Sequence, residues 1–248
     1  MTQLYVEALI RADLETLWER TQEPSQHRRW DLRFTDIDHL PRLSEAEPQR
    51  FRYATRLAPF LNVAGTGVFA GERHRPDGTR TCALRFASPH PLSLLAEGSG
   101  YWRYVPTPDG IRFLTGYDYR PRWGRFGKMA DRLVFRPLMG WATAWSFDRL
   151  RLWLEHGRSP ARSLAAALAE LALRVAVAVL SVVLAAAGPA ATGRVPELAG
   201  AAPVLAAVLL AAAVLLPPLP GTPAARRTLR TPPASVRTPA VLATLEQA

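Results

Sequence analysis

The feature that most constrains this 248-residue chain is a pair of long apolar runs in its last third. No charged residue occurs from Val175 to Gly193, and none occurs from Leu198 to Ala225. Each run can supply the roughly 20 residues that an α-helix needs to cross a bilayer. A buried helical hairpin in a larger soluble core is the alternative. Alanine, leucine and valine occupy every face, without the polar stripe of a soluble helix, so the pattern favours two membrane spans.

Basic residues flank the two runs unequally. The turn between the runs holds Arg194 beside Glu197, whereas arginines cluster outside it, at 149, 151, 158 and 162 before the first run and at 226, 227, 230 and 237 after the second. The two apolar runs predict a transmembrane hairpin over residues 161–222, so the protein would be integral to the cell membrane. Because arginine and lysine concentrate on the cytoplasmic side of membrane spans, both termini should face the cytoplasm. The segment from Met1 to Arg20 is too charged for a secretory signal.

The rest of the chain divides into one domain and a tail. Residues 1–160 are enough for a single well-filled domain. Residues 223–248 are rich in arginine and proline, a composition typical of disorder. The net charge of +10 is spread along the chain, so we expect no nucleic-acid partner. Attraction to an anionic inner leaflet explains the same charge.

Alternating apolar and polar residues predict an antiparallel sheet in the first domain. Asp13 is expected to cap a short helix after the first strand, and Pro24 to open a second one. A long helix follows from Phe126 to His156, which Pro137 would kink or divide. The expected strands cover residues 4–10, 32–40, 51–57, 63–73, 79–87, 94–105 and 111–120.

This order of elements, with the segments ADLETLW (12–18), RRWD (28–31) and FDRLRLWLE (147–155), resembles the SRPBCC superfamily, the START-like, polyketide cyclase/dehydrase-like group. The resemblance covers Leu4 to about His156. It implies an α+β helix-grip fold, in which a curved antiparallel sheet surrounds a long C-terminal helix with a hydrophobic cavity between them. Members bind lipids, sterols, polyketides or other apolar ligands, and a minority are enzymes. The two apolar runs lie outside the domain common to that family.

Period-two alternation assigns inward faces to the strands and so supplies candidates for the cavity lining. Arg103 should face outward, which turns its two neighbours inward. Ordinary packed core is the alternative interpretation of aromatic residues at these spacings. The expected ligand-binding residues are Tyr53, Thr55, Phe86, Trp102, Tyr104, Phe113, Thr115, Tyr117 and Tyr119 from the strands, with Met129, Trp141 and Trp145 from the long helix.

The sequence offers no catalytic constellation. Its five histidines stand far apart without the pair spacing of a metal site. The segment GTGVFAG at 65–71 does not match a phosphate-binding glycine loop, and there is no GxSxG elbow. Asp118 and Asp131 each lie near an arginine in the sequence, which favours ion pairing. We therefore expect no catalytic residue, no metal and no cofactor.

Three functional classes remain open. The favoured one is a membrane-tethered module that holds an apolar small molecule or lipid in the cavity. The second is a polyketide cyclase- or dehydratase-like enzyme, whose mark would be a convergent pair such as a tyrosine with an arginine. The third is a membrane interaction module with a filled interior. Binding is favoured over catalysis, and the sequence does not identify the ligand, protein partners or the oligomeric state.

Overall fold

The computed structural model describes residues 3–42, 44, 47–58, 61–191 and 196–233, and it divides the chain into two compact units. Unit 1 contains the residues up to Pro160 together with those from Ala224 onward. Unit 2 consists of Ala161–Pro223. The chain therefore leaves unit 1, forms unit 2 and returns to unit 1.

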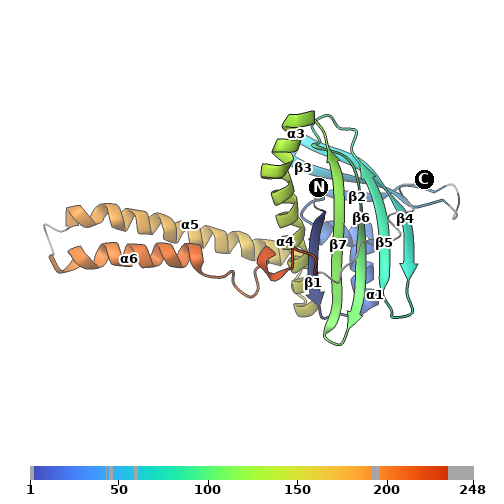
Figure 1. Ribbon diagram of the computed structural model, residues 1–248. Helices are drawn as coiled ribbons and strands as arrows, with labels where there is room; N and C mark the ends of the chain where they lie inside the picture. The colour runs from blue at the N-terminus through green and yellow to red at the C-terminus, as the bar shows by residue number, and fades with distance from the viewer. Residues whose placement is uncertain (1–2, 43, 45–46, 59–60, 192–195, 234–248) are drawn as a thin grey trace. The chain divides into compact units, whose positions relative to one another are not determined.

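Unit 1 is built on a seven-stranded antiparallel sheet with the order β1-β7-β6-β5-β4-β3-β2 (Figure 1). The second to seventh strands form a meander, and the first strand pairs with the seventh and so forms one edge of the sheet. With its helices, this sheet makes an α+β unit that fits the expected helix-grip architecture. The strands are β1 (Leu4–Ile10), β2 (Asp36–His39), β3 (Arg50–Ala58), β4 (Leu61–His74), β5 (Arg80–Ala87), β6 (Leu95–Thr107) and β7 (Gly110–Pro121).

Two short helices, α1 (Leu14–Gln22) and α2 (Pro24–Trp30), connect β1 to β2. The Asp13 side chain accepts a hydrogen bond of 2.7 Å from the Thr16 amide, which satisfies a free N–H at the start of α1. Pro24 begins α2, where a missing N–H costs little. Both helix starts are where the sequence predicts them.

The long helix after β7 is divided, as Pro137 indicates. Helix α3 (Gly124–Ala130) continues into a π-helical turn at Asp131–Phe135, and α4 runs over Arg136–His156. The Arg136 amide donates to the Asp131 carbonyl, five residues back, which is the bond that defines a π-turn. Pro137 then stands in the first turn of α4, where its ring is tolerated.

The strand expected at 32–40 is shorter, and the expectation is corrected here: β2 covers Asp36–His39. Side chains satisfy the backbone before it. The Leu32 amide donates to Ser146 Oγ at 2.8 Å, and the Arg33 amide donates to Asp31 Oδ1 at 3.0 Å. These amides therefore do not take part in a strand ladder.

An aromatic core fills the space between α4 and strands β1, β6 and β7. Phe147 of α4 stacks on Phe113 with 4.5 Å between ring centroids, and Trp102 lies 5.2 Å from the same ring. Trp30 at the end of α2 closes the cluster, 6.2 Å from Phe147. Phe113, Phe147 and Trp30 are fully buried. This end of the sheet–helix interface is packed core.

Glycines on β4 let aromatic rings of β3 lie across the sheet. A methyl group at Gly67 would come within 2.1 Å of the Phe51 ring, and one at Gly65 within 2.3 Å of the Tyr53 ring. Phe51 and Tyr53 are the cross-strand partners of these two glycines. The GTG segment therefore serves ring packing in a strand.

The segment that follows unit 2 packs onto unit 1. The Ala224 amide donates to Asp148 Oδ2 at 2.8 Å, and Arg227 pairs with the same oxygen at 3.0 Å. Leu229 forms an isolated antiparallel bridge with Glu7 of β1. We call residues 224–229 the return segment. The disorder expected over 223–248 therefore does not describe these residues, because a buried carboxylate and a strand edge hold them, while residues 234–248 lie outside the described part.

Unit 2 consists of α5 (Pro160–Ala191) without its first residue, of α6 (Pro196–Leu215), and of a segment after α6 that includes a turn at 220–221. Arg174 pairs with Glu170 one turn earlier at 2.6 Å and donates to the Ala213 carbonyl at 2.8 Å. By length and composition, one helix among the described residues could cross a membrane, over Pro160–Ala186 with a mean hydropathy of 2.2. The described apolar part of α6 is shorter, Ala201–Leu215. The described residues thus contain one candidate span where the sequence predicts two.

Candidate functional site

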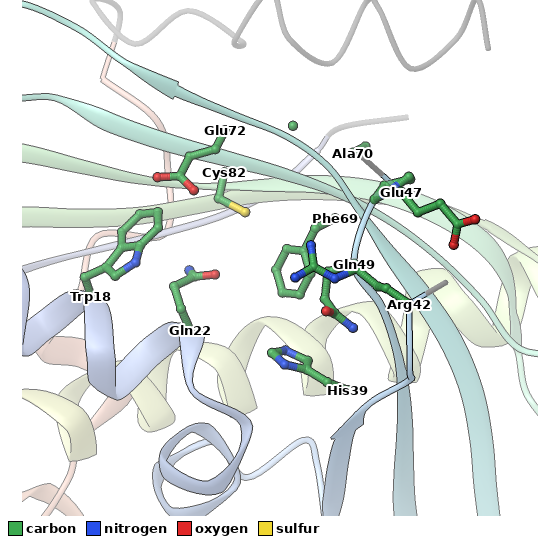
Figure 2. Close-up of a pocket in the computed structure, with 12 residues that line it drawn as sticks. Trp18, Gln22, His39, Arg42, Glu47, Gln49, Phe69, Ala70, Glu72 and Cys82 are labelled. Atoms are coloured by element: carbon green, nitrogen blue, oxygen red, sulfur yellow. The ribbon is translucent and has the colours of Figure 1, made fainter. Parts of the chain in front are cut away.

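A pocket of about 730 Å³ opens between α1 and the inner face of the sheet at β4 and β5 (Figure 2). Trp18 and Gln22 contribute its wall on α1, and Phe69 and Cys82 contribute its floor on the sheet. His39 at the end of β2 lines the same space. Small-molecule sites in proteins commonly enclose 300–1,000 Å³, so this pocket has the size of a ligand site.

The apolar lining is held by packing outside the pocket. The Trp18 ring lies 5.0 Å from Tyr104, and the Arg80 guanidinium stands 5.5 Å from the Trp18 ring. Phe69 packs on Phe51 with 5.0 Å between ring centroids. These contacts fix two aromatic surfaces, one on α1 and one on β4.

A β-bulge shapes the floor. The pairing of β4 with β5 shifts between Phe69 and Gly71, so Ala70 is an extra residue without a partner on β5. Ala70 and Gly71 both line the pocket. A bulge bends its strand and redirects side chains. The hollow therefore forms where the regular ladder is interrupted.

Two polar side chains in the pocket have unused hydrogen-bonding capacity. Gln22 donates from Nε2 to the Tyr104 hydroxyl at 2.7 Å, and its Oε1 has no partner among the described residues. The Tyr104 hydroxyl is also 2.6 Å from Thr21 Oγ1, which fixes the orientation of this group. The ring nitrogens of His39 bond to nothing in the described part of the chain, and partial desolvation lowers the pKa of His39 below its usual value, which favours the neutral ring at pH 7. The pocket thus offers an acceptor and a neutral imidazole.

Charged residues stand among the other lining residues. Arg42 and Glu72 both line the pocket, and Glu72 forms an ion pair with His74. Gln49 uses its Nε2 to hold the Leu40 carbonyl at 2.8 Å, which joins the segments on either side of residues 41–48. The lining thus combines aromatic surface with both signs of charge.

The chemistry of this lining is suited to binding. Burial raises the pKa of the Cys82 thiol to about 12, so the thiol stays protonated and is a poor nucleophile. No group of three or more potential metal-binding side chains occurs within the described residues. Cys82 therefore acts as a small apolar surface.

None of the twelve expected ligand-binding residues lines this pocket. Trp102, Tyr104 and Phe113 point inward as expected, but they belong to the packed aromatic core. Tyr104 reaches the pocket indirectly, through its bond to Gln22. Phe86 lies against Gly98 of β6, since a methyl group there would approach its ring to 2.6 Å.

The expected hydroxyl groups bond to protein atoms. Thr115 donates to the Tyr101 carbonyl at 2.9 Å, and Thr55 donates to the Arg33 carbonyl at 2.5 Å. Tyr53 donates to the Ala87 carbonyl at 3.3 Å. The other two contacts are between side chains, Tyr117 with Thr143 at 2.9 Å and Tyr119 with Asp131 at 2.5 Å. These groups are used for structure.

The three residues expected from the long helix differ in their exposure to solvent. Trp145 is buried, whereas Met129 is 53% exposed and Trp141 is 43% exposed. Their exposure places both side chains partly at the surface of unit 1. The spacing predicts that all three line a cavity, whereas two of them are exposed.

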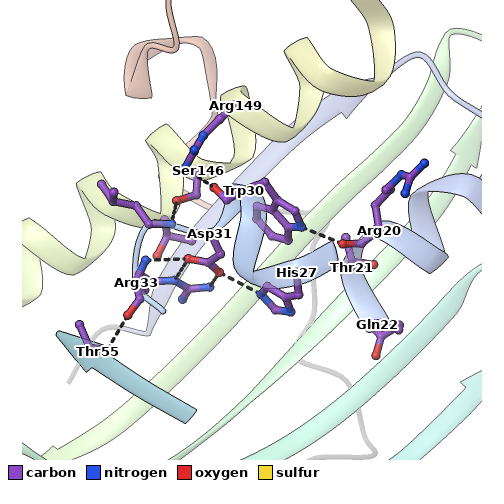
Figure 3. A network of polar contacts seen from close by, with 12 residues as sticks. Arg20, Thr21, Gln22, His27, Trp30, Asp31, Arg33, Thr55, Ser146 and Arg149 are labelled. Carbon is purple, nitrogen blue, oxygen red and sulfur yellow. Dashed lines mark hydrogen bonds and ion pairs between the residues drawn. The ribbon is translucent and has the colours of Figure 1, made fainter. Parts of the chain in front are cut away.

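A buried ion pair lies in the connection between α2 and β2 (Figure 3). Arg33 donates to the two carboxylate oxygens of Asp31 at 2.9 and 2.6 Å, and His27 Nε2 lies 3.1 Å from Asp31. Burial alone would raise the pKa of Asp31, but the charge of Arg33 and these hydrogen bonds lower it below its usual range. The Arg33 guanidinium also stands 5.6 Å from the Tyr117 ring. An arginine and a tyrosine therefore do converge in the interior, with protein partners for both.

The sheet, the long helix and the pocket define an α+β unit with a candidate small-molecule site, joined to an apolar helical unit. No family model matches the chain. The chain is 48% identical over 166 residues to a Bacillus subtilis (strain 168) protein named uncharacterized membrane protein YndG. The match covers 66% of this chain and 62% of that protein, so the chain spans less than two thirds of the length of this relative.

Solved structures that resemble the chain include two lipid-transfer proteins and an aromatase/cyclase. Human StAR-related lipid transfer protein 5 matches with a TM-score of 0.46 and 13% identity, covering 61% of this chain and 76% of its own. A STAR-related lipid transfer protein from Xanthomonas axonopodis has a TM-score of 0.46 and 19% identity, covering 61% and 85%. The Zhui aromatase/cyclase from Streptomyces sp. R1128 has a TM-score of 0.40 and 13% identity, covering 60% and 96%.

Proposed function

We propose that this protein is a membrane-anchored module that binds a small molecule with an apolar body in the pocket between α1 and the sheet. The observation that carries the proposal is the pocket itself, with aromatic surfaces from Trp18 and Phe69 and an acceptor on Gln22 that has no partner among the described residues. Ligand sites typically combine apolar walls with a few convergent polar groups.

The lining also suggests the class of ligand. Trp18, Phe69 and Cys82 suit an aliphatic or ring-containing body. Within the described residues the Oε1 of Gln22 has no donor, and a hydroxyl or an N–H group of the ligand would supply one. Neutral His39 can then donate or accept a second bond. We infer an amphiphilic ligand, such as a lipid or a hydroxylated ring compound.

Membrane anchoring rests on α5 and on the path of the chain. The apolar segment of α5 is long enough to cross a bilayer. In its most apolar stretch of 18 residues, 11% is buried, whereas the core helix of a soluble protein is mostly buried. Unit 1 contains residues from both sides of unit 2, because the return segment binds Asp148. If α5 crosses the membrane, the chain has to cross back. We infer that α6 makes this return, as the second arm of a hairpin over 161–222.

Orientation follows from the arginine-rich flanks of that hairpin. Basic residues favour the cytoplasmic side, so unit 1 and the tail would lie in the cytoplasm at the cell membrane. The relative from Bacillus subtilis is named a membrane protein, which is consistent with this placement.

The enzyme alternative depends on the arginine and tyrosine in the interior. Arg33 is paired with Asp31, and the Tyr117 hydroxyl is paired with Thr143. A catalytic group needs to be available to the substrate. Because both groups already have protein partners, we favour binding. The filled-module alternative accounts for the packed core around Phe113 but gives no role to the pocket.

The test is mass spectrometry of the molecules that co-purify with the full chain in detergent. We expect an apolar or amphiphilic compound at a stoichiometric level. Ala70→Phe should reduce it several-fold, because the new ring would occupy the pocket. Ala96→Phe is the matched control, since Ala96 is the extra residue of a second bulge, in β6, and does not line the pocket. Equal ligand content in both variants, or none in the parent protein, would contradict the proposal.

A further inference from the structure

Unit 1 carries an unusual concentration of exposed large apolar side chains along α3, the π-turn and the start of α4. Phe126 is 64% exposed and Leu133 is 68% exposed. We call this set the α3–α4 apolar surface, and it comprises Trp123, Phe126, Met129, Leu133, Leu138 and Trp141. These exposed side chains follow one another along a single helical stretch, and a concentration of exposed apolar surface marks an interaction site.

Exposed basic residues lie next to this surface, with the same spacing along the helix as three of its apolar residues. Phe126, Met129 and Leu133 follow a spacing of i, i+3, i+7, and each is preceded by an exposed cation. Neighbouring residues on a helix are turned by about 100° from one another, so the apolar row and the cationic row run side by side. The cations of that row are Arg125, Lys128 and Arg132.

Acidic charge is absent from the exposed part of this segment as the structure describes it. Asp131 is the one acid between 122 and 142. It is buried, it accepts from the Tyr119 hydroxyl, and it pairs with Arg136 at 3.0 Å. The segment therefore presents apolar side chains and positive charge to its surroundings.

We propose that the α3–α4 apolar surface docks on a bilayer surface that contains anionic lipids. An apolar row beside a cationic row is the pattern of helices that lie in the membrane interface. Trp123 and Trp141 stand at the two ends of the surface, and tryptophan is enriched at the headgroup level of membranes. Anionic headgroups complement Arg125, Lys128 and Arg132.

The docking rests on the anchoring proposed above, because α5 begins four residues after the end of α4. A unit tethered at that point stays close to the lipid surface, which raises its effective concentration there. Docking would hold the unit in one orientation on the membrane. It would also place the apolar side chains of α3 among lipid, which removes the free-energy cost of exposing them to water.

The experiment uses the full chain in proteoliposomes, with one cysteine labelled by an environment-sensitive fluorophore in a Cys82→Ala background. Phe126→Cys reports on the proposed surface, Asp109→Cys in the β6–β7 turn is the exposed control, and Val183→Cys in α5 reports on anchoring. Lipids that carry a quencher reveal contact with the bilayer. In vesicles of phosphatidylcholine and phosphatidylglycerol, we expect the label at 126 to be quenched several-fold more than the label at 109.

Charge variants test the anionic requirement. Changing Arg125, Lys128 and Arg132 together to glutamine should bring quenching at 126 down to the level at 109. Changing Arg52, Arg73 and Arg75 to glutamine removes the same charge from other exposed positions and should leave quenching at 126 unchanged. Equal quenching at 126 in pure phosphatidylcholine would overturn the anionic docking.

The remaining outcomes separate this inference from the anchoring. A quenched label at 183 with an unquenched label at 126 overturns the docking alone. An unquenched label at 183 overturns the proposed anchoring, whatever the label at 126 reports. The fluorescence of the label at 126 could also depend on the protein-to-lipid ratio and not on the lipid composition. That result would mean that the surface contacts a second copy of this chain, and it would overturn the docking on lipid.

Discussion

Glu7 and Leu229 exchange two backbone hydrogen bonds of 2.9 Å, although almost the whole chain separates them in sequence. Glu7 lies in β1, which forms one edge of the sheet, and its side chain is bound by Arg112 at 2.7 Å. The return segment therefore covers part of an open sheet edge. An edge covered in this way is less available for pairing with another chain.

The pairing of Arg227 with Asp148 gives the first prediction. Asp148 is fully buried and accepts from Ala224, Arg151 and Arg227. Arg227→Ala should lower the free energy of unfolding of unit 1 by about 1–3 kcal/mol, since one bond to a buried carboxylate is lost. Arg226→Ala, at the exposed neighbouring position, should change it by less than about 0.5 kcal/mol. Denaturant titration followed by tryptophan fluorescence measures both, and equal effects would contradict the role of the return segment.

The order of elements is predictable from the sequence because local signals carry it. Alternation locates the strands, Asp13 locates the start of α1, and Pro137 locates the division of the long helix. The short β2 is harder to predict, because side chains of Asp31 and Ser146 bind the amides before it. Ser146 lies on α4, and such a contact does not appear in local sequence.

The candidate site is less predictable, for reasons visible at particular residues. Alternation correctly turns Trp102, Tyr104 and Phe113 inward, but it does not distinguish a packed interior from an open one. The pocket depends on the bulge at Ala70 and on the placement of α1, which are set by the whole fold. Met129 in α3 and Trp141 in α4 belong to an apolar helical pattern, which does not tell whether the face that they occupy is covered or exposed.

The buried pair of Asp31 and Arg33 gives a prediction about stability. Asp31→Asn should destabilise unit 1 by about 3–5 kcal/mol, because it leaves the Arg33 charge buried without a counter-ion. Asp38→Asn, at an exposed position on β2, is the control and should change stability by less than about 0.5 kcal/mol. Chemical denaturation at neutral pH compares the two, and similar stabilities would mean that Arg33 is solvated.

The same pair predicts the direction of a pH effect. The pKa of Asp31 is lower in the folded protein than its usual value of about 3.9. The stabilisation is therefore complete above that value and is lost as the pH falls from it toward the lower folded pKa. The parent protein should lose stability over this acidic range more steeply than Asp31→Asn. Melting curves at a series of pH values would show parallel losses if Asp31 were not the cause.

Cys82 supplies a prediction about reactivity. Since burial raises its thiol pKa to about 12, the thiolate fraction should grow about tenfold per pH unit between pH 7 and 10, with no plateau. The rate of alkylation by a small reagent measures this fraction. The unfolded protein is the control, and its rate should level off above a pKa of about 8.5. A plateau near that pH in the folded protein would show that the floor of the pocket is open to water.

The path of the chain gives the last prediction, which concerns topology. Unit 1 holds the return segment, so positions before α5 and after α6 should lie on the same side of the membrane. A cysteine at Thr192, in the connection between the two helices, should react with an impermeant reagent added to intact cells. Cysteines at Ser44 and Arg226 should react only after the cells are opened, because the arginine-rich flanks favour the cytoplasm. If the cysteines at 44 and 226 differed in accessibility, α6 would not return the chain. If both were labelled from outside while that at 192 was not, the hairpin would be inverted.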